Sequence, residues 1–211
     1  MIYDISPPVT ARLAVWPGDV PFSRQILTDL RAGDGTTSSA LHGTAHLGAH
    51  ADALGHVDRR GAPIDAMPLD RYLGPCQVVR VSVGRGAAVA PGAITEPIKA
   101  PRVLIATGTY PDPERFNEDF AALSVELIDD LHARGAVLVG VDTPSVDLYA
   151  AADLPVHKRL AGYGMASLEG LVLGEVPAGI YELIALPLRL VGCDASPVRA
   201  VLRELPPSGL A

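Results

Sequence analysis

The sequence predicts an α/β fold with a mixed β-sheet core and helices packed on it. Short runs of β-branched and apolar residues are bounded by Gly or Pro, which is the pattern of buried strands. Two of these runs flank a segment with helical periodicity. The 21 Gly and 19 Pro among 211 residues indicate many turns and long loops. Because no repeat or clear linker interrupts the chain, we expect a single domain over residues 1–211.

The central elements are predicted by local patterns. Strands are expected at residues 76–83, 102–107, 136–141, 165–173 and 181–190. A helix is expected between the second and third strands, because Ser124 is a suitable N-cap and Gly135 stands where a terminating glycine belongs. The apolar residues at helical spacing between them are Val125, Ile128 and Leu131. Such a strand–helix–strand unit pairs its two strands in parallel.

Two further helices are expected in the C-terminal half. One should run from Pro155 to Ala161. A closing helix should begin at Ser196, with Pro197 at its first position, and continue to about Leu205. Ser is a favoured N-cap, and proline is tolerated at the first helical position.

Composition excludes several classes of function. The formal net charge is −7 and no block of Lys or Arg is present, which argues against a nucleic-acid partner. The first eight residues lack the basic and apolar regions of a signal peptide, and the apolar runs are too short to span a bilayer. Cys76 and Cys193 are isolated in the sequence. We therefore expect a cytoplasmic protein with two reduced thiols and no membrane partner.

A histidine cluster is the most informative feature of the chain. His46, His50 and His56 lie within eleven residues together with Asp52. Imidazole nitrogen and carboxylate oxygen are ligands for zinc, manganese or iron. A straight strand would separate His46 and His50 by roughly 13 Å, so the segment must curl, and Gly48 allows a bend at low energetic cost. The cluster predicts a metal site.

The remaining metal ligands must come from elsewhere in the chain. The best candidates are His157 and Glu169, each at the edge of an expected element. An open metal site usually performs hydrolysis. Ser145 could be considered a nucleophile, but no G-x-S-x-G elbow surrounds any serine, so a serine hydrolase is disfavoured.

Other polar and aromatic residues have simpler interpretations. We interpret His42 as a surface or supporting histidine, and His132 as a cation suited to the last turn of a helix. Asp142 and Asp147 follow a strand, where each can cap the next turn. Trp16 is the only tryptophan and lies in a turn-forming segment. It is either a core aromatic or a rigid ring that stacks on an aromatic substrate.

Motifs along most of the chain carry a resemblance to a known family. The segment 46–56 fits the frame H-x-G-T-H-x-D-x-P-x-H. The other similar segments are 16–19, 61–64, 68–76, 142–147, 168–170, 181–188 and 194–200. With these residues the chain resembles the cyclase-like metal-dependent hydrolases and, within them, the bacterial kynurenine formamidases (arylformamidases).

The resemblance implies a swivelling β/β/α fold, a homodimer and two divalent metal ions per chain, Zn²⁺ with Mn²⁺ as the alternative. The positions that match the family's metal ligands are His46, His50, Asp52, His157 and Glu169. His46 and His50 match ligands of a first ion, and His157 matches a ligand of a second. Asp52 and Glu169 match carboxylates shared by both. His56 matches the catalytic acid/base.

The resemblance also implies the reaction, the hydrolysis of N-formyl-L-kynurenine to L-kynurenine and formate in tryptophan degradation. Trp16 matches a ring that contacts this substrate. Three positions depart from the family pattern: Ala49, Leu54 and Lys158 replace the usual Thr, Pro and second His. The alternatives are a hydrolase of a cyclic amide such as isatin, a non-catalytic metal-binding protein, and a metal-free binding module for tryptophan metabolites.

Overall fold

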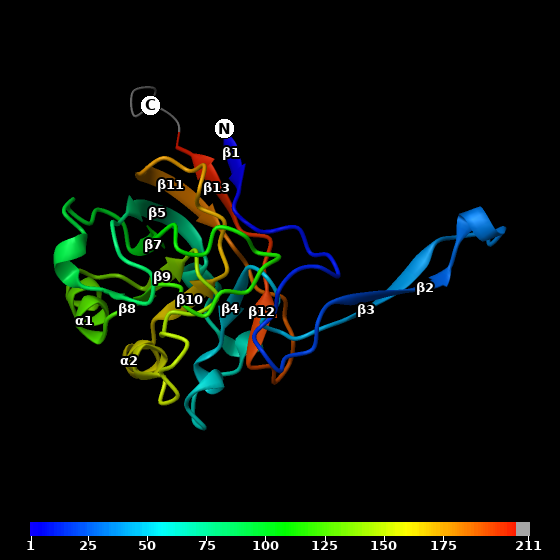
Figure 1. Ribbon diagram of the computed structural model, residues 1–211, viewed down its shortest axis with the longest axis horizontal. Coiled ribbons are helices and arrows are strands. Elements are labelled where there is room, and N and C mark those ends of the chain that lie inside the picture. The colour runs from blue at the N-terminus through cyan, green and yellow to red at the C-terminus, as the bar shows by residue number, and fades with distance from the viewer. Residues whose placement is uncertain (206–211) are drawn as a thin grey trace.

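A nine-stranded mixed sheet forms the body of the protein (Figure 1), and the computed structural model describes residues 1–205. In chain order its strands are β1 (Ile2–Asp4), β4 (His50–Asp52), β5 (Leu73–Arg80), β7 (Arg102–Ala106), β9 (Leu138–Val141), β10 (Ala166–Glu169), β11 (Gly179–Ile184), β12 (Ala195–Pro197) and β13 (Val201–Glu204). Their spatial order is β1-β13-β11-β5-β7-β9-β10-β4-β12. The four strands from β5 to β10 pair in parallel, and the flanking pairs are antiparallel. The expected α/β class with a mixed sheet is confirmed.

Two helices lie side by side on one face of the sheet (Figure 1): α1 (Val125–Ala133) and α2 (Pro155–Tyr163). Successive strand residues point to opposite faces. Val103 and Ile105 of β7 therefore belong to the buried cluster beneath the helices, while Leu104 belongs to the cluster on the other face. This double burial explains why the central strands read as continuous apolar runs.

Most local predictions for these elements are confirmed. The Ser124 hydroxyl accepts a hydrogen bond from the backbone N–H of Leu127 at 3.1 Å, and Gly135 has a left-handed φ of 86° just beyond α1. Strands β7 and β9, on either side of α1 in sequence, are parallel neighbours. Helix α2 begins at Pro155 as predicted and continues to Tyr163.

The predicted closing helix is wrong. Ser196 and Pro197 lie in β12, and the rest of the predicted helix contains β13 (Val201–Glu204) after a three-residue connection. Proline is tolerated because β12 is an edge strand. The Ser196 hydroxyl accepts a hydrogen bond from the N–H of Leu188 instead of capping a helix. In β13 the side chain of Leu202 is buried and that of the next residue, Arg203, is exposed, which is the alternation expected of a strand rather than a helix. Pairing with β11 and β1 outweighs the local capping signal.

Strand lengths also differ from expectation. The segments predicted at 165–173 and 181–190 form only β10 and β11, and β10 ends where Gly170 adopts φ 65°. The first predicted strand lies three residues earlier, as β5.

A hairpin extends away from the body (Figure 1), formed by β2 (Ser23–Thr28) and β3 (Ser38–His42). A small parallel pair joins β6 (Ala88–Val89) to β8 (Ala122–Leu123). Single 3₁₀ turns are found at Leu30–Ala32, Leu54–His56, Ile64–Ala66, Leu69–Arg71 and Pro91–Ala93. Within residues 1–205, neither helix has the length and apolar character needed to cross a membrane.

Candidate metal centre

The metal centre is built on two antiparallel strands and one helix. His50 and Asp52 are two residues apart on β4, so they lie on the same face. Glu169, the last residue of β10, lies directly opposite His50 in the strand register. His157 comes from α2 and is buried. Pairing and packing therefore bring together side chains that are more than a hundred positions apart in sequence.

His46 reaches the same centre because the chain bends before β4. Gly48 adopts φ 60°, and the rings of His46 and His50 lie 5.1 Å apart between centroids. The predicted bend at Gly48 is confirmed. A second glycine allows the close approach of this bend to β10: a Cβ on Gly170 would overlap the carbonyl oxygen of Gly48. Both positions require glycine, because each has a left-handed φ.

Two carboxylates share the three histidines between them. Asp52 Oδ1 lies 3.1 Å from His46 Nδ1 and 3.6 Å from His50 Nε2, while Asp52 Oδ2 lies 3.3 Å from His157 Nε2. Glu169 Oε1 lies 3.1 Å from His157 Nε2, and Oε2 lies 3.3 Å from His50 Nε2. Two potential ligand groups result, and Asp52 belongs to both: His46, His50 and Asp52, and Asp52, His157 and Glu169.

Two atoms in this centre indicate that a cation belongs there. His50 Nε2 and Asp52 Oδ1 are buried without a hydrogen-bond partner among the described residues. Buried polar atoms are nearly always satisfied, since an unpaired one costs about 1–3 kcal/mol. A divalent cation accepts electron pairs from both atoms. The donor set thus fits a metal ion.

The orientation of the histidine rings supports the same conclusion. Each of the three rings points one nitrogen at Asp52 or Glu169, and its other nitrogen lies within hydrogen-bond distance of a further acceptor. The three pairs are His50 Nδ1 with the Gly48 carbonyl at 2.9 Å, His157 Nδ1 with Asp147 Oδ2 at 2.7 Å, and His46 Nε2 with Asp194 Oδ2 at 3.0 Å. Metal-binding histidines typically have such a second partner, which fixes the tautomer and the ring plane.

The charges of the centre also suit a cation. Burial alone would raise the pKa of the Asp52 carboxyl, but the close contacts of His157 and His46 with its oxygens outweigh burial and hold the pKa well below its usual range. Burial alone would lower the pKa of His46, but the close contact and charge of Asp52, with a further contribution from Asp194, raise it to about 9. Asp52 is therefore ionised at neutral pH, and a cation bound at His46 would displace a proton.

His56 lies beside the two ligand groups but contacts neither carboxylate. Its ring centroid is 4.5 Å from that of His46 and 5.6 Å from that of His157. Its side chain is 28% exposed, and Nδ1 lies 3.8 Å from Oδ2 of the exposed Asp194. Burial and the neighbouring histidines lower the pKa of His56, against the attraction of Asp52. A third grouping of His46, His56 and Asp194 has ligand spacing, but its carboxylate is largely exposed.

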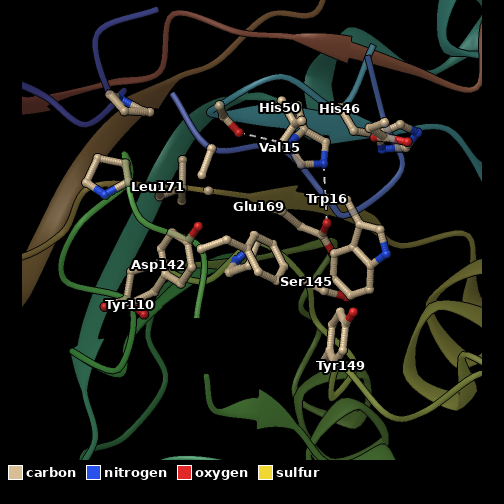
Figure 2. A pocket seen from close by; sticks show the side chains of 18 of the residues that line it. Val15, Trp16, His46, His50, Tyr110, Asp142, Ser145, Tyr149, Glu169 and Leu171 are labelled. Atoms are coloured by element: carbon tan, nitrogen blue, oxygen red, sulfur yellow. Dashed lines mark hydrogen bonds and ion pairs between the residues drawn. The ribbon is translucent and has the colours of Figure 1, made fainter. Parts of the chain in front are cut away.

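A cavity of about 760 Å³ opens over the centre and is lined by His46, His56, His157 and Glu169, among others. Its walls are largely aromatic and apolar. Figure 2 shows His50 and Glu169 facing each other, with Trp16 and Tyr149 among the side chains that line the cavity. Trp16 is half-buried and packs against Tyr149 at 5.1 Å and Phe116 at 5.6 Å between centroids. It thus belongs to an aromatic cluster and also lines the cavity.

Two supporting carboxylates were missed as parts of the site. Asp147 accepts hydrogen bonds from the N–H groups of Val156 and His157, so it caps α2 as well as holding the His157 ring. The sequence predicted that Asp147 caps the next turn, whereas the structure places its carboxylate at the first turn of α2, nine and ten residues later. Asp194 contacts His46 and His56, which precede it by 148 and 138 positions. Nothing local in the sequence indicated these contacts.

The remaining polar candidates lie outside the ligand groups. His42 is exposed at the end of β3, and His132 is exposed and stacks on Tyr163 at 3.8 Å. Asp142 lines the cavity, but its predicted cap of the next turn is wrong, because its carboxylate accepts hydrogen bonds from the N–H groups of Thr107 and Gly108, just after β7.

Comparison with known proteins gives consistent findings. The Cyclase family model, described as "Putative cyclase", matches residues 3–148, more than half of the chain. The structure of a potential metal-dependent hydrolase with cyclase activity is similar at 27% identity and a TM-score of 0.85, covering 98% of this chain and 99% of that one. A predicted metal-dependent hydrolase from Bacillus stearothermophilus is similar at 27% identity and a TM-score of 0.81, covering 96% and 97%. Isatin hydrolase A from Labrenzia aggregata, bound to benzyl benzoate, shares the fold at 22% identity and a TM-score of 0.83, covering 96% and 93%.

Proposed function

Because this chain belongs to the Cyclase family and is an enzyme of the cyclase-like metal-dependent hydrolases, we propose that it hydrolyses N-formyl-L-kynurenine to L-kynurenine and formate. One observation carries the proposal. Two ligand groups that share Asp52 lie at a cavity with aromatic walls. His56 lies beside these groups but forms no ion pair with Asp52 or Glu169. An aryl formamide offers an aromatic ring for the walls and an amide for the centre.

The proposed cofactor is a pair of divalent ions, Zn²⁺ in preference to Mn²⁺. His46 and His50 would hold one ion and His157 the other, with Asp52 and Glu169 shared. When bound, such ions lower the pKa of water to about 7 and polarise a carbonyl oxygen. The two carboxylates offset part of the charge of two dications.

The chain's own residues supply orientation and proton transfer. The rings of Trp16 and Tyr149 would hold the aryl ring of the substrate by stacking. His56 Nδ1 faces Asp194, which leaves Nε2 to take a proton from the attacking water and deliver it to the anilide nitrogen. This delivery is required because an aniline anion is a poor leaving group.

A formamidase assay on protein purified without chelator tests the proposal. We expect turnover of N-formyl-L-kynurenine, loss of turnover after chelation, and recovery with added Zn²⁺. Isatin is the matched rival substrate, since it contains a cyclic aryl amide. A higher kcat/KM for isatin would assign the chain to cyclic-amide hydrolysis instead. Retained metal with no turnover of either amide would indicate a non-catalytic metal-binding protein.

Trp16 provides a second test of the same site. Trp16→Ala should raise KM for the formamide, because the stacking contact is worth about 0.5–1.5 kcal/mol beyond buried area. Trp16→Phe, which retains a ring, is the control. A large fall in Tm with an unchanged KM would make Trp16 a core residue only.

We further propose that the working form is a cytoplasmic homodimer. The free thiols of Cys76 and Cys193 suit a reducing compartment. The β2–β3 hairpin supports a second copy as partner, because an isolated two-stranded hairpin is marginal in water. Its exposed apolar side chains include Ile26 and Leu27, 54% and 58% exposed. Light scattering should give twice the chain mass, and a monomer at micromolar concentration would refute this.

A further inference from the structure

The cavity is lined by carboxylates in addition to Glu169 of the metal centre. Among the described residues, those that line it include four carboxylates and neither Lys nor Arg. The four are Asp19, Asp142, Glu169 and Asp194. These walls therefore offer no Lys or Arg side chain to a negative substrate group away from the metal centre, whereas a positive group there meets carboxylate acceptors.

Three of these carboxylates are already engaged. Asp142 accepts hydrogen bonds from Thr107 and Gly108. Glu169 faces two histidines of the metal centre, and Asp194 holds the ring of His46. These contacts tie Asp142 to the backbone and hydroxyl of Thr107 and to the backbone of Gly108, and they tie Glu169 and Asp194 to histidines of the metal centre.

Asp19 is different. Within residues 1–205, the one hydrogen bond recorded for its carboxylate comes from the Thr44 hydroxyl, at 3.0 Å to Oδ2. An ionised carboxylate can accept about four hydrogen bonds. Asp19 is half-buried on the cavity wall, so an ion pair there is screened less than one in open water.

The chain also places Asp19 in a fixed relation to Trp16. The Asp19 N–H donates to the Trp16 carbonyl at 2.9 Å, which closes one tight turn. An aromatic ring and a carboxylate with free acceptor capacity thus line the same cavity from a single turn. This combination suits an aromatic molecule that carries an ammonium group.

We propose that Asp19 is a specificity residue that binds the ammonium group of an aromatic amide whose ring lies against Trp16. The inference rests on the proposed function and narrows its substrate class to ammonium-bearing aryl amides. For N-formyl-L-kynurenine, the α-ammonium pairs with Asp19, and the α-carboxylate adds little to binding.

Ligand binding tests this without turnover. Trp16 is the only tryptophan, so quenching of its fluorescence reports binding at the cavity. Three ortho-aminophenyl ketones serve as product-like probes, with an alkyl chain ending in an ammonium, a methyl or a carboxylate group. The ammonium probe should bind most tightly and the carboxylate probe least. Asp19→Asn should reduce the preference for the ammonium probe over the methyl probe by roughly 10- to 100-fold, the range for losing a hydrogen bond to a charged group.

Asp153→Asn is the matched control. Asp153 is exposed, next to the cavity-lining Ala152 but outside the lining, so its removal changes the net charge equally. It should leave the preference unchanged. An equal fall in both variants would mean a general electrostatic effect and would overturn the assignment of Asp19. So would an unchanged preference in Asp19→Asn, or tightest binding of the carboxylate probe.

The corresponding formanilides separate this inference from the proposed function. Turnover of all three with no preference for the ammonium form refutes the role of Asp19 and leaves formamide hydrolysis standing. No turnover of any formanilide, with the ammonium preference in binding intact and sensitive to Asp19→Asn, refutes formamide hydrolysis and supports the ammonium site.

Discussion

Replacing His56 by alanine distinguishes a proton-transfer residue from a metal ligand. Spacing in the sequence allows either role, because His56 lies within the ligand cluster. In the structure its ring approaches His46 at 4.5 Å between centroids but has no contact with Asp52 or Glu169 short enough to count as an ion pair. We therefore expect His56→Ala to keep its metal and to lose activity.

The expected magnitudes follow from the contacts. Loss of a general acid/base lowers kcat by roughly 10²–10⁴-fold, which corresponds to about 3–5 kcal/mol of transition-state stabilisation. The loss of stability should be small, since the side chain is 28% exposed and its nearest carboxylate contact is 3.8 Å. His50→Ala should behave differently. His50 is buried and lies between Asp52 and Glu169, so its removal leaves two buried carboxylates with fewer counter-charges.

The assay combines kinetics, elemental analysis and thermal unfolding on the same preparations. His42→Ala, at an exposed histidine outside the cluster, is the control and should match the parent in all three. His50→Ala should lose metal, activity and Tm together, because metal binding is coupled to folding. If His56→Ala is metal-depleted and regains activity in excess Zn²⁺, His56 is a ligand and our reasoning about the acid/base fails.

Three further predictions concern the metal, the backbone and the thiols. Elemental analysis should approach two divalent ions per chain, and a firm value of one in excess Zn²⁺ would remove the shared role of the carboxylates. Gly164→Ala should lower the free energy of unfolding, measured in urea, by about 1–2 kcal/mol, because Gly164 has a left-handed φ. Gly170→Ala should lower it by much more, because Gly170 has a left-handed φ and its new Cβ would also meet the backbone oxygen of Gly48. Equal losses of stability in the two variants would contradict this. Burial raises the pKa of the Cys76 thiol to about 12, so at pH 8 only about one in ten thousand is a thiolate, and a disulfide reagent should modify half-buried Cys193 first; faster reaction at Cys76 would refute its burial.

Local chemistry in the sequence predicted the central features of the protein. The capping serine and terminating glycine of α1 are effects within one or two turns, so they could be read directly from neighbouring residues. The same holds for the curl at Gly48, which follows from the spacing of His46 and His50. The ligand types also follow from chemistry alone, because few residue types bind divalent metals.

Positions that depend on distant partners could not be predicted in this way. Ser196 and Pro197 carry a helix-start signal, yet they pair with β4, which is nearly 150 positions earlier. The energy of strand pairing and burial outweighs capping, which is worth about 1 kcal/mol. A single sequence does not show which distant strand will be the partner.

The site divides along the same line. The residue types and spacing of the 46–56 segment were enough to predict metal ligands and a curl there. Folding was needed to place Asp52 and Glu169 against His157, to hold the histidine rings with Asp147 and Asp194, and to put Asp19 on the cavity wall with one hydrogen bond among the described residues. The physical reason is that a side chain's neighbours are set by strand register and helix packing, and these depend on contacts between residues far apart in the chain.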